Sequence, residues 1–468
     1  MDRSDEDLPR TAAAGDGAAP RRLLGLREAI ALIVGVVIGA GIFKSPSIVA
    51  GLSGSAGWMF ALWLLGGLIS LVGALCYSEL STAYPHPGGD YHYLHRAYGR
   101  GTAFLFGWAR FAVITTGSIA LLAFVFGDYM QQALPLAMLP EGWGAAAYAC
   151  AVIVLLSLLN LRGLRAGAGA QTWLTMAEIG GLVLLAVAAA FFASPAPPPP
   201  ADAAATTAAP ASIGLAMVFV LLTYGGWNEA AYISAEVRGG AASMVRALTL
   251  SIGIITVLYL MVTWACLQSL GMHGMARSEA LAADVMGLAF GPSGQKLISV
   301  LVAVSALTSI NATMIVGART GFAMGRDWAP LRRLGQWDGE RGTPAVAMSV
   351  QCGAALLLVG LGVASGSGFK AMVEFTAPVF WLFFLLSGLS LFVLRRREPA
   401  LPRPFLVPFY PALPLLFCAS CAYMLWSSLS YVGSQSLGGI NAAWIGLAVL
   451  ASGGLLLLFL GRSERGPS

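Results

Sequence analysis

Long apolar stretches fill most of this chain, and short polar or Gly/Pro-rich connections separate them. A helix needs roughly 20 apolar residues to cross the hydrocarbon of a bilayer. The pattern therefore predicts an all-α integral membrane protein with twelve transmembrane helices. The predicted spans cover residues 28–51, 57–80, 102–131, 145–161, 170–193, 212–236, 246–270, 294–323, 344–364, 369–394, 407–431 and 440–461.

Two of these spans contain glycine clusters near their middle: IGAGIF at 38–43 in the first span and YGGWN at 224–228 in the sixth. Backbone groups freed inside a membrane have no water to bind, so such breaks are tolerated mainly beside a cavity or a ligand. Two breaks five spans apart predict discontinuous helices 1 and 6 in a transporter built from two repeats. The alternative is that these glycines only let helices pack closely.

The composition agrees with a membrane protein. The chain is 57% hydrophobic and 10% charged, with a mean hydropathy of +0.77, whereas soluble proteins have about 25% charged residues. The net charge of +5 does not indicate nucleic-acid binding, because the basic residues lie in short runs between apolar segments.

Arginine and lysine are concentrated in every second connection, which predicts that both termini are cytoplasmic in a multi-pass protein of the cell membrane. The cytoplasmic set is Arg21, Arg22, Arg27, Arg96, Arg100, Arg162, Arg165, Arg238, Arg246, Arg326, Arg332, Arg333, Arg341, Arg395, Arg396, Arg397, Arg403, Arg462 and Arg465. The opposite connections contain Arg277, Lys296 and Lys370.

A Pro/Ala-rich connection divides the first ten spans into two sets of five, with the two breaks in the first helix of each set. The predicted segments are a cytoplasmic tail (1–27), repeat 1 with helices 1–5 (28–193), an extracellular loop (194–211), repeat 2 with helices 6–10 (212–397), helices 11 and 12 (398–461) and a cytoplasmic tail (462–468).

An interrupted helix offers two kinds of backbone group. The half beyond the break presents free amides and the positive end of its dipole, and the half before it presents free carbonyls. The amides suit a carboxylate and the carbonyls suit an ammonium, so the pair predicts a zwitterionic ligand such as an amino acid. Gly39 and Gly41 would let this ligand approach the backbone, and Asn228 would add a polar group inside the membrane.

Four segments resemble the amino acid–polyamine–organocation (APC) permeases. They are GVVIGAGIFKSP (35–46), YPHPGGDYHYLHRAYG (84–99), TYGGWNEAAYISAEV (223–237) and LRRREPALPRPFLVPFYP (394–411), in the family's order. The sixth-helix segment is most similar to the L-type amino acid transporter branch and its bacterial relatives. This resemblance implies two inverted five-helix repeats plus two C-terminal helices, and transport by alternating access.

The resemblance also implies roles for the residues at the two breaks. The amides of Ala40, Gly41 and Ile42 would hold the substrate carboxylate. The carbonyls of Val37, Leu222, Thr223 and Gly225 would hold its ammonium. Asn228 would make a polar contact and Trp227 would pack beside the site. The remaining predicted substrate-binding residues are Ile38, Gly39 and Tyr224.

Two positions depart from the family pattern. Leu222 stands where L-type members have an aromatic gate, so the bulky groups left nearby are Tyr224, Trp227 and Phe43. Glu178 stands in the fifth span where many members carry a lysine. Because desolvation disfavours a charged carboxylate, Glu178 can couple a proton or a cation to transport. It can instead contact a cationic substrate, or be a protonated side chain that only bonds a neighbouring helix.

The sequence thus predicts a secondary amino acid permease that works by exchange or by proton symport. The alternatives are a polyamine or cationic amino acid carrier and a transporter-like nutrient sensor. No GxxxxGK[ST] motif or nucleophile–base arrangement suggests ATP use or an enzyme. No cofactor and no metal are expected, although His86, His92 and His95 cluster in one loop. Animal members of the L-type branch that this chain resembles use a cysteine in the corresponding connection to link a heavy chain. The connection 132–144 contains no cysteine, so no disulfide-linked heavy chain is expected. The expected partners are the substrate, the lipid bilayer and a coupled proton.

Overall fold

The structure is a computed structural model that describes residues 25–86, 88–140, 143–162, 168–192, 210–228, 239–338, 343–366, 368–434 and 442–463. Within these ranges the protein is helical, and the only β pairing is an isolated bridge between Asp338 and Thr343. The prediction of an all-helical protein is therefore confirmed for the described part of the chain.

The helical elements follow one another with short connections. They are α1 (Leu26–Val37), η1 (Ala40–Phe43), α2 (Ser45–Ser53), α3 (Ala56–Ala83), α4 (Gly89–Tyr98), α5 (Arg100–Ala109), η2 (Arg110–Thr115), α6 (Thr116–Ala133), α7 (Trp143–Leu161), α8 (Ala168–Phe191), α9 (Pro210–Thr223), α10 (Gly240–Arg277), α11 (Leu281–Asp327), η4 (Ala329–Leu331), α12 (Ala345–Ala364), α13 (Gly368–Arg397), α14 (Ala412–Ser434) and α15 (Ala442–Ser463).

Eight helical stretches among the described residues are long and apolar enough to cross a membrane, and three shorter apolar helices accompany them. Their outer faces remain apolar: on α3, for example, Leu64 is 59% and Leu68 is 54% exposed. Such faces suit lipid, because the hydrocarbon of a bilayer is the solvent they would meet. The count of twelve spans and the inverted repeat stay predictions, since parts of the chain, including residues 193–209 and 229–238, lie outside the described residues.

Two long helices contain a glycine with non-helical backbone angles, Gly271 in α10 (φ 64°) and Gly291 in α11 (φ 65°). A positive φ is readily adopted by glycine alone, so the chain turns sharply at both positions. The segment between them, residues 272–290, connects the long parts of α10 and α11. We call it the connecting segment.

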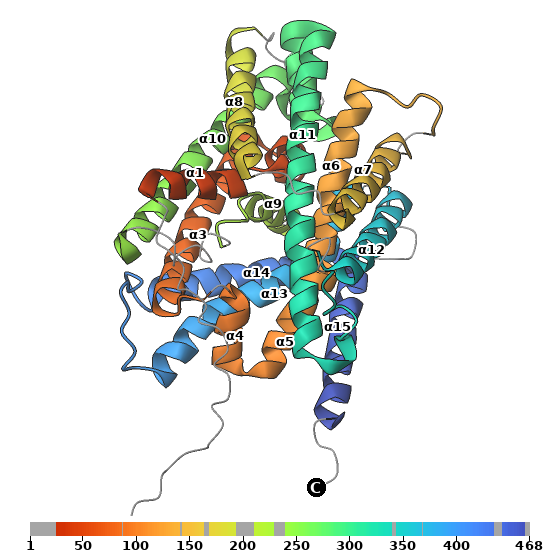
Figure 1. The fold of residues 1–468 in the computed structure, drawn as a ribbon. Helices are drawn as coiled ribbons and strands as arrows, with labels where there is room; N and C mark the ends of the chain where they lie inside the picture. Colours follow the sequence, from red (N-terminus) through yellow and green to blue (C-terminus); the bar gives the residue numbers. More distant parts are fainter. Residues whose placement is uncertain are drawn as a thin grey trace, which may run out of the picture.

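Many arginines gather at one end of the bundle, which we call the arginine-rich end: Arg96, Arg100, Arg326, Arg395, Arg396 and Arg397. In Figure 1 this is the lower end, where α4 and the start of α5 lie near the C-terminal end of α15. The same view places α1 and α9 near the middle of the molecule's height. The two interrupted spans therefore lie between the ends of the bundle.

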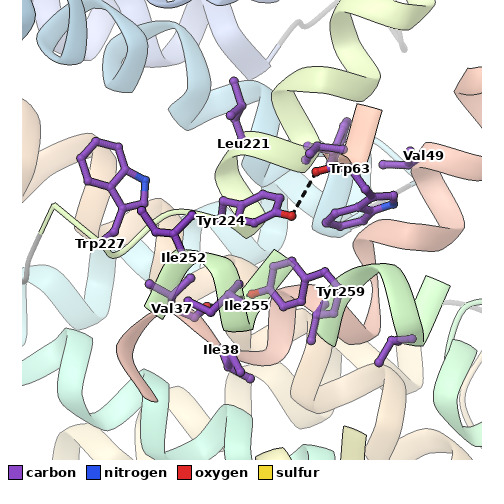
Figure 2. Close-up of a cluster of buried hydrophobic side chains, with 14 of the residues drawn as sticks. Val37, Ile38, Val49, Trp63, Leu221, Tyr224, Trp227, Ile252, Ile255 and Tyr259 are labelled. Carbon is purple, nitrogen blue, oxygen red and sulfur yellow. Dashed lines mark hydrogen bonds between the residues drawn. The ribbon is translucent and has the colours of Figure 1, made fainter. Parts of the chain in front are cut away.

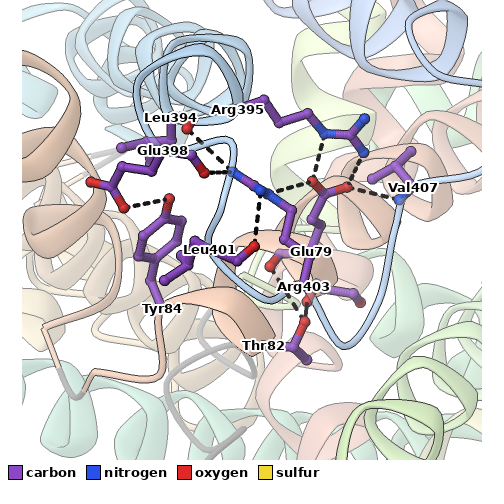
Figure 3. Close-up of polar contacts among 10 residues, drawn as sticks. Glu79, Thr82, Tyr84, Leu394, Arg395, Glu398, Leu401, Arg403 and Val407 are labelled. Atoms are coloured by element: carbon purple, nitrogen blue, oxygen red, sulfur yellow. Dashed lines mark hydrogen bonds and ion pairs between the residues drawn. The ribbon is translucent and has the colours of Figure 1, made fainter.

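Buried ion pairs fix the helices at the arginine-rich end (Figure 3). Glu79 is 2% exposed, and its two carboxylate oxygens accept hydrogen bonds from Arg395 Nε and Nη2 at 2.7 and 2.5 Å. The amide of Val407 donates to the same carboxylate at 2.8 Å, and Arg403 Nε lies 3.7 Å away. Because buried charges need such partners, Glu79 ties α3 to α13 and to the loop that follows it.

Candidate substrate site at two helix breaks

The first predicted span is interrupted at its glycine cluster. α1 ends at Val37, the backbone of Ile38 (ψ 98°) and Gly39 (φ −128°, ψ −171°) is extended, and the turn η1 then leads into α2 at Ser45. The first amides of a helical turn have no acceptor within that turn. The break therefore presents carbonyls at the end of α1 and amide donors at the start of η1.

In the sixth predicted span the described helix ends at the glycine cluster. α9 ends at Thr223, and the Gly225 amide donates to the Leu222 carbonyl at 3.0 Å in the turn that follows. Gly226 has φ +108°, a conformation that strains any residue with a side chain. The predicted continuation of this helix, residues 229–236, lies outside the described residues.

The two breaks meet inside the bundle. A Cβ atom added to Gly41 would lie 3.7 Å from Thr223 Cγ2, and one added to Gly226 would lie 3.0 Å from the Val36 carbonyl oxygen. The Thr223 hydroxyl lies 2.6 Å from Ser45 Oγ. Two backbone segments nearly two hundred positions apart thus approach closely at positions where glycine leaves room.

A tyrosine from α10 joins the ends of the two interrupted helices. The Tyr259 hydroxyl lies 3.1 Å from the Val37 carbonyl oxygen and 3.0 Å from the Thr223 carbonyl oxygen, and it can donate to either. Its side chain is fully buried. Sequence reasoning missed this residue, and the only available signal was a polar hydroxyl within an apolar span. The two carbonyls predicted to hold an ammonium therefore converge on one hydrogen-bond donor.

Aromatic side chains pack around this point (Figure 2). The ring of Tyr224 lies 5.0 Å from that of Tyr259 and 6.1 Å from that of Trp63, centroid to centroid. The Tyr224 hydroxyl donates to the Trp63 carbonyl at 3.0 Å, the dashed line in Figure 2. Tyr224 therefore fixes the turn after α9 against α3.

Trp227 packs in a separate aromatic cluster formed by α3, α13 and α14. Its ring lies 5.3 Å from Tyr77, 5.7 Å from Phe384 and 6.3 Å from Phe417. A Cβ added to Gly73 of α3 would lie 2.6 Å from the indole, so a glycine makes room for it. Trp227 thus packs the turn that follows α9 against α3, α13 and α14.

The other predicted residues differ in exposure. Ile38, Ile42 and Asn228 are buried, whereas Gly39, Gly41, Leu222 and Gly225 keep intermediate exposure. The surface of the two breaks that is still accessible is therefore glycine and main chain, with Leu222 beside it. A ligand that reaches this surface meets backbone groups first.

Glu178 lies on α8 and points to α11. It is 5% exposed, and its Oε1 accepts a hydrogen bond from the Ser305 hydroxyl. One helical turn further along α11, Ser309 Oγ lies 4.0 Å from where a Cβ of Gly39 would stand. The carboxyl group is thus one turn of α11 away from the first break rather than inside it.

The far side of the first break is tied to the connecting segment. Lys44 Nζ lies 2.7 Å from Asp128 Oδ2 of α6 and donates to the Glu279 carbonyl at 2.6 Å. The Ser47 hydroxyl donates to the Ser278 carbonyl at 2.7 Å. These contacts hold η1, α2, α6 and the connecting segment together on the side away from the arginine-rich end.

A second tyrosine strengthens this closure. The Tyr129 hydroxyl donates to the Phe43 carbonyl at 2.9 Å and accepts from the Ala282 amide at 3.2 Å. One hydroxyl therefore joins η1 to the connecting segment through α6. Polar contacts between η1, α2, α6 and the connecting segment therefore cover the breaks on this side.

Interrupted apolar helices whose breaks meet within one bundle define a class of membrane transport proteins. Residues 24–450 match the amino acid permease family, which is nearly the whole chain. The chain therefore belongs to the amino acid permease family, whose members are transporters and not enzymes.

Curated relatives agree with this assignment. The serine/threonine exchanger SteT of Bacillus subtilis is 28% identical over 415 residues, which cover 87% of this chain and 91% of SteT. The human large neutral amino acids transporter small subunit 2 is 29% identical over 467 residues, or 97% of this chain and 83% of that protein. The human b(0,+)-type amino acid transporter 1 is 28% identical over 410 residues, or 86% and 81%. The names of all three relatives describe exchangers or transporters of amino acids.

Proposed function

We propose that this protein is a secondary active permease that moves L-amino acids across the cell membrane by alternating access, by exchange or by proton symport. The observation that carries the proposal is the convergence of the Val37 and Thr223 carbonyls, from two interrupted helices, on one buried hydroxyl. The hydroxyl brings the two carbonyls close together, and the second lone pair of each carbonyl is left for a single ammonium.

In this proposal the substrate lies between the breaks. Its carboxylate is held by the amides of Ala40, Gly41 and Ile42, which open the second half of the first span. Its ammonium is held by carbonyls at the ends of α1 and α9, with Tyr259 between them. The Leu222 carbonyl already accepts from the Gly225 amide and would serve through its second lone pair.

Glu178 is proposed as the group that couples a proton to transport. It is the buried acid of α8, and it bonds α11 one turn from the first break. A change in its protonation would alter that contact, since a carboxylate accepts from Ser305 whereas a carboxyl group can also donate. A site for a cationic substrate would be expected to place a second acidic residue beside Glu178. The described hydrogen-bond partner of Glu178 is instead Ser305.

The arginine-rich end is proposed to face the cytoplasm, with both termini on that side. The protein is proposed to work without a disulfide-linked second chain. All six cysteines are free: four are buried, and Cys150 and Cys352 are half-buried within α7 and α12. The relatives named as a small subunit do not establish such an assembly for this chain.

Counterflow in proteoliposomes tests the proposal. Vesicles preloaded with unlabelled amino acid are offered each of the twenty labelled amino acids and several polyamines, with and without an imposed pH gradient. We expect accumulation of one or more neutral amino acids. Uptake of polyamines alone would replace this proposal with the cationic alternative, and specific binding without counterflow would favour a sensor. Dependence on the pH gradient separates symport from exchange.

A further inference from the structure

The turn η1 lies between the first break and the connecting segment, and it is only four residues long. Its first amides are those that we propose for the substrate carboxylate, and its last residue is followed directly by Lys44. The Lys44 amide donates to the Gly41 carbonyl at 3.1 Å, so the end of the turn is bonded to its middle. A shift of Gly41 toward a ligand would therefore also move Lys44.

Lys44 contacts two elements beyond the turn. Its Nζ lies 2.7 Å from Asp128 Oδ2 of α6 and donates to the Glu279 carbonyl of the connecting segment at 2.6 Å. An ammonium carries three donors, so one side chain can bond both partners at once. The pair is largely shielded from solvent, where attraction between opposite charges is stronger than at an exposed surface. Lys44 thus links η1 to α6 and to the connecting segment.

The connecting segment has the features of a part that can move as a unit. It is bounded by Gly271 and Gly291, which both have positive φ. Glycine tolerates changes of backbone angle that strain other residues, so both positions can serve as hinges. Between them, Ala282 and Ala283 are 1% and 0% exposed. The segment therefore packs against the bundle while its two ends remain free to bend.

We propose that Lys44 is a positioning residue that couples amino acid binding at the first break to closure of the connecting segment. The inference rests on the proposed function. A carboxylate held by the η1 amides would fix the turn, and the fixed turn keeps Lys44 within reach of Asp128 and the Glu279 carbonyl. Without a ligand the turn moves more freely, and the connecting segment separates from α6 more often. Such coupling is reciprocal, so closure also strengthens substrate binding.

Thiol labelling of the connecting segment measures its closure. The reporter is Ala282→Cys, at a buried position of the segment, with Ala283→Cys as a second reporter. In proteoliposomes of known protein orientation, a membrane-impermeant thiol reagent is added on the side of the connecting segment. Labelling of the chain without the reporter is subtracted. We expect saturating L-leucine or L-threonine, whichever counterflow accepts, to slow labelling about tenfold, a typical effect between coupled sites.

Lys44→Met in the same reporter chain should remove this protection. Labelling without substrate should be at least about tenfold faster, because an ion pair and a charge-assisted hydrogen bond are lost. Substrate should then slow labelling by less than about twofold. Lys44→Arg keeps the charge and should retain most of the protection. A substrate effect of the same size in the native chain and in Lys44→Met would overturn the inference.

The double variant Lys44→Met/Asp128→Asn separates coupling from stability. It leaves neither charge of the pair, so it should recover much of the folding stability that Lys44→Met loses. Substrate should nevertheless fail to slow its labelling. A return of substrate protection in the double variant would show that Lys44 acts through stability alone, and would overturn the inference.

Gln132→Met is the matched control on α6. Gln132 Oε1 accepts from Gln295 Nε2 at 2.8 Å, and Gln295 lies on α11 beyond Gly291, outside the connecting segment. Labelling and substrate protection should match those of the native chain, and a change equal to that of Lys44→Met would overturn the specific role of Lys44. A chain that transports no amino acid would instead refute the proposed function, and the coupling with it, even if Lys44→Met still accelerated labelling.

Discussion

Lys44 Nζ lies 2.7 Å from Asp128 Oδ2, and the two side chains are only 12% and 14% exposed. This ion pair joins the second half of the interrupted first helix to α6, beside the connecting segment. Removing one member of a buried pair leaves an uncompensated charge, which costs more than removing both. The pair therefore gives a direct test of how firmly this side is held.

We expect Lys44→Met to lower the free energy of unfolding by about 3 kcal/mol, and the double variant Lys44→Met/Asp128→Asn to recover much of it. Thermal unfolding of the detergent-solubilised chain measures both. The two single variants and the double variant form a cycle, and simple additivity of the Lys44 and Asp128 effects would show that the two charges do not interact.

Tyr259→Phe should weaken substrate binding without unfolding the protein. The ring would still pack against Trp63 and Tyr224, but the Val37 and Thr223 carbonyls would lose their shared donor. A hydrogen bond contributes about 1 kcal/mol, so we expect KM in counterflow to change by roughly five- to tenfold.

Tyr148→Phe is the matched control for Tyr259→Phe, because the Tyr148 hydroxyl also donates to a backbone carbonyl, that of Leu134 at 2.7 Å. It lies in α7, away from both breaks. If the two variants had the same KM, the position of Tyr259 at the breaks would have no functional meaning.

The glycine clusters predicted where the helices break, but not which side chains hold the breaks. The local sequence indicates that the helices break at Gly39 and Gly41 and at Gly225 and Gly226, because glycine clusters within a membrane span favour a break beside a cavity or a ligand. The Tyr259 contacts depend on how α10 packs against α1, which brings a side chain 222 positions from Val37 to the ends of α1 and α9. No local pattern contains that information.

Other elements were unpredictable for the same reason. The connecting segment follows from positive φ at Gly271 and Gly291, but both glycines lie in the predicted connection between spans 246–270 and 294–323, and their backbone angles cannot be read from the sequence. The Glu79–Arg395 pair joins two residues that lie 316 positions apart along the chain. Its two-pronged geometry is set by α3 meeting α13 in the folded state.

Glu178→Gln should abolish accumulation driven by a pH gradient while leaving exchange intact. Glutamine keeps an oxygen that can accept from Ser305 but cannot take up a proton. The measurement is uptake in proteoliposomes across a range of pH values, with Glu374→Gln as a control carboxylate on α13. Uptake by Glu178→Gln that matched the native chain at every pH would remove Glu178 from the mechanism.

Glu79→Gln should destabilise the arginine-rich end. The substitution leaves Arg395 and Arg403 beside a neutral group in a site where the native carboxylate is 2% exposed. Loss of one partner of a buried pair costs about 3–5 kcal/mol, so we expect a clear fall in unfolding temperature. Arg396→Gln, which changes an exposed arginine next to the pair, should lower the unfolding temperature by much less; an equal fall would show that Glu79 is not specifically required.

His92, in α4 at the arginine-rich end, should make the stability of the fold sensitive to acid. Burial, with the neighbouring His86 and Arg96 charges, lowers the pKa of His92 to about 4 from the ordinary 6.5. Between pH 6.5 and pH 4, His92 is protonated in the unfolded chain but neutral in the folded chain. The free energy of unfolding therefore falls as the pH decreases from 6.5 to 4. His92→Asn should flatten this part of the pH profile of the unfolding temperature. Equal slopes for the native chain and the variant over this interval would show that His92 does not carry the effect.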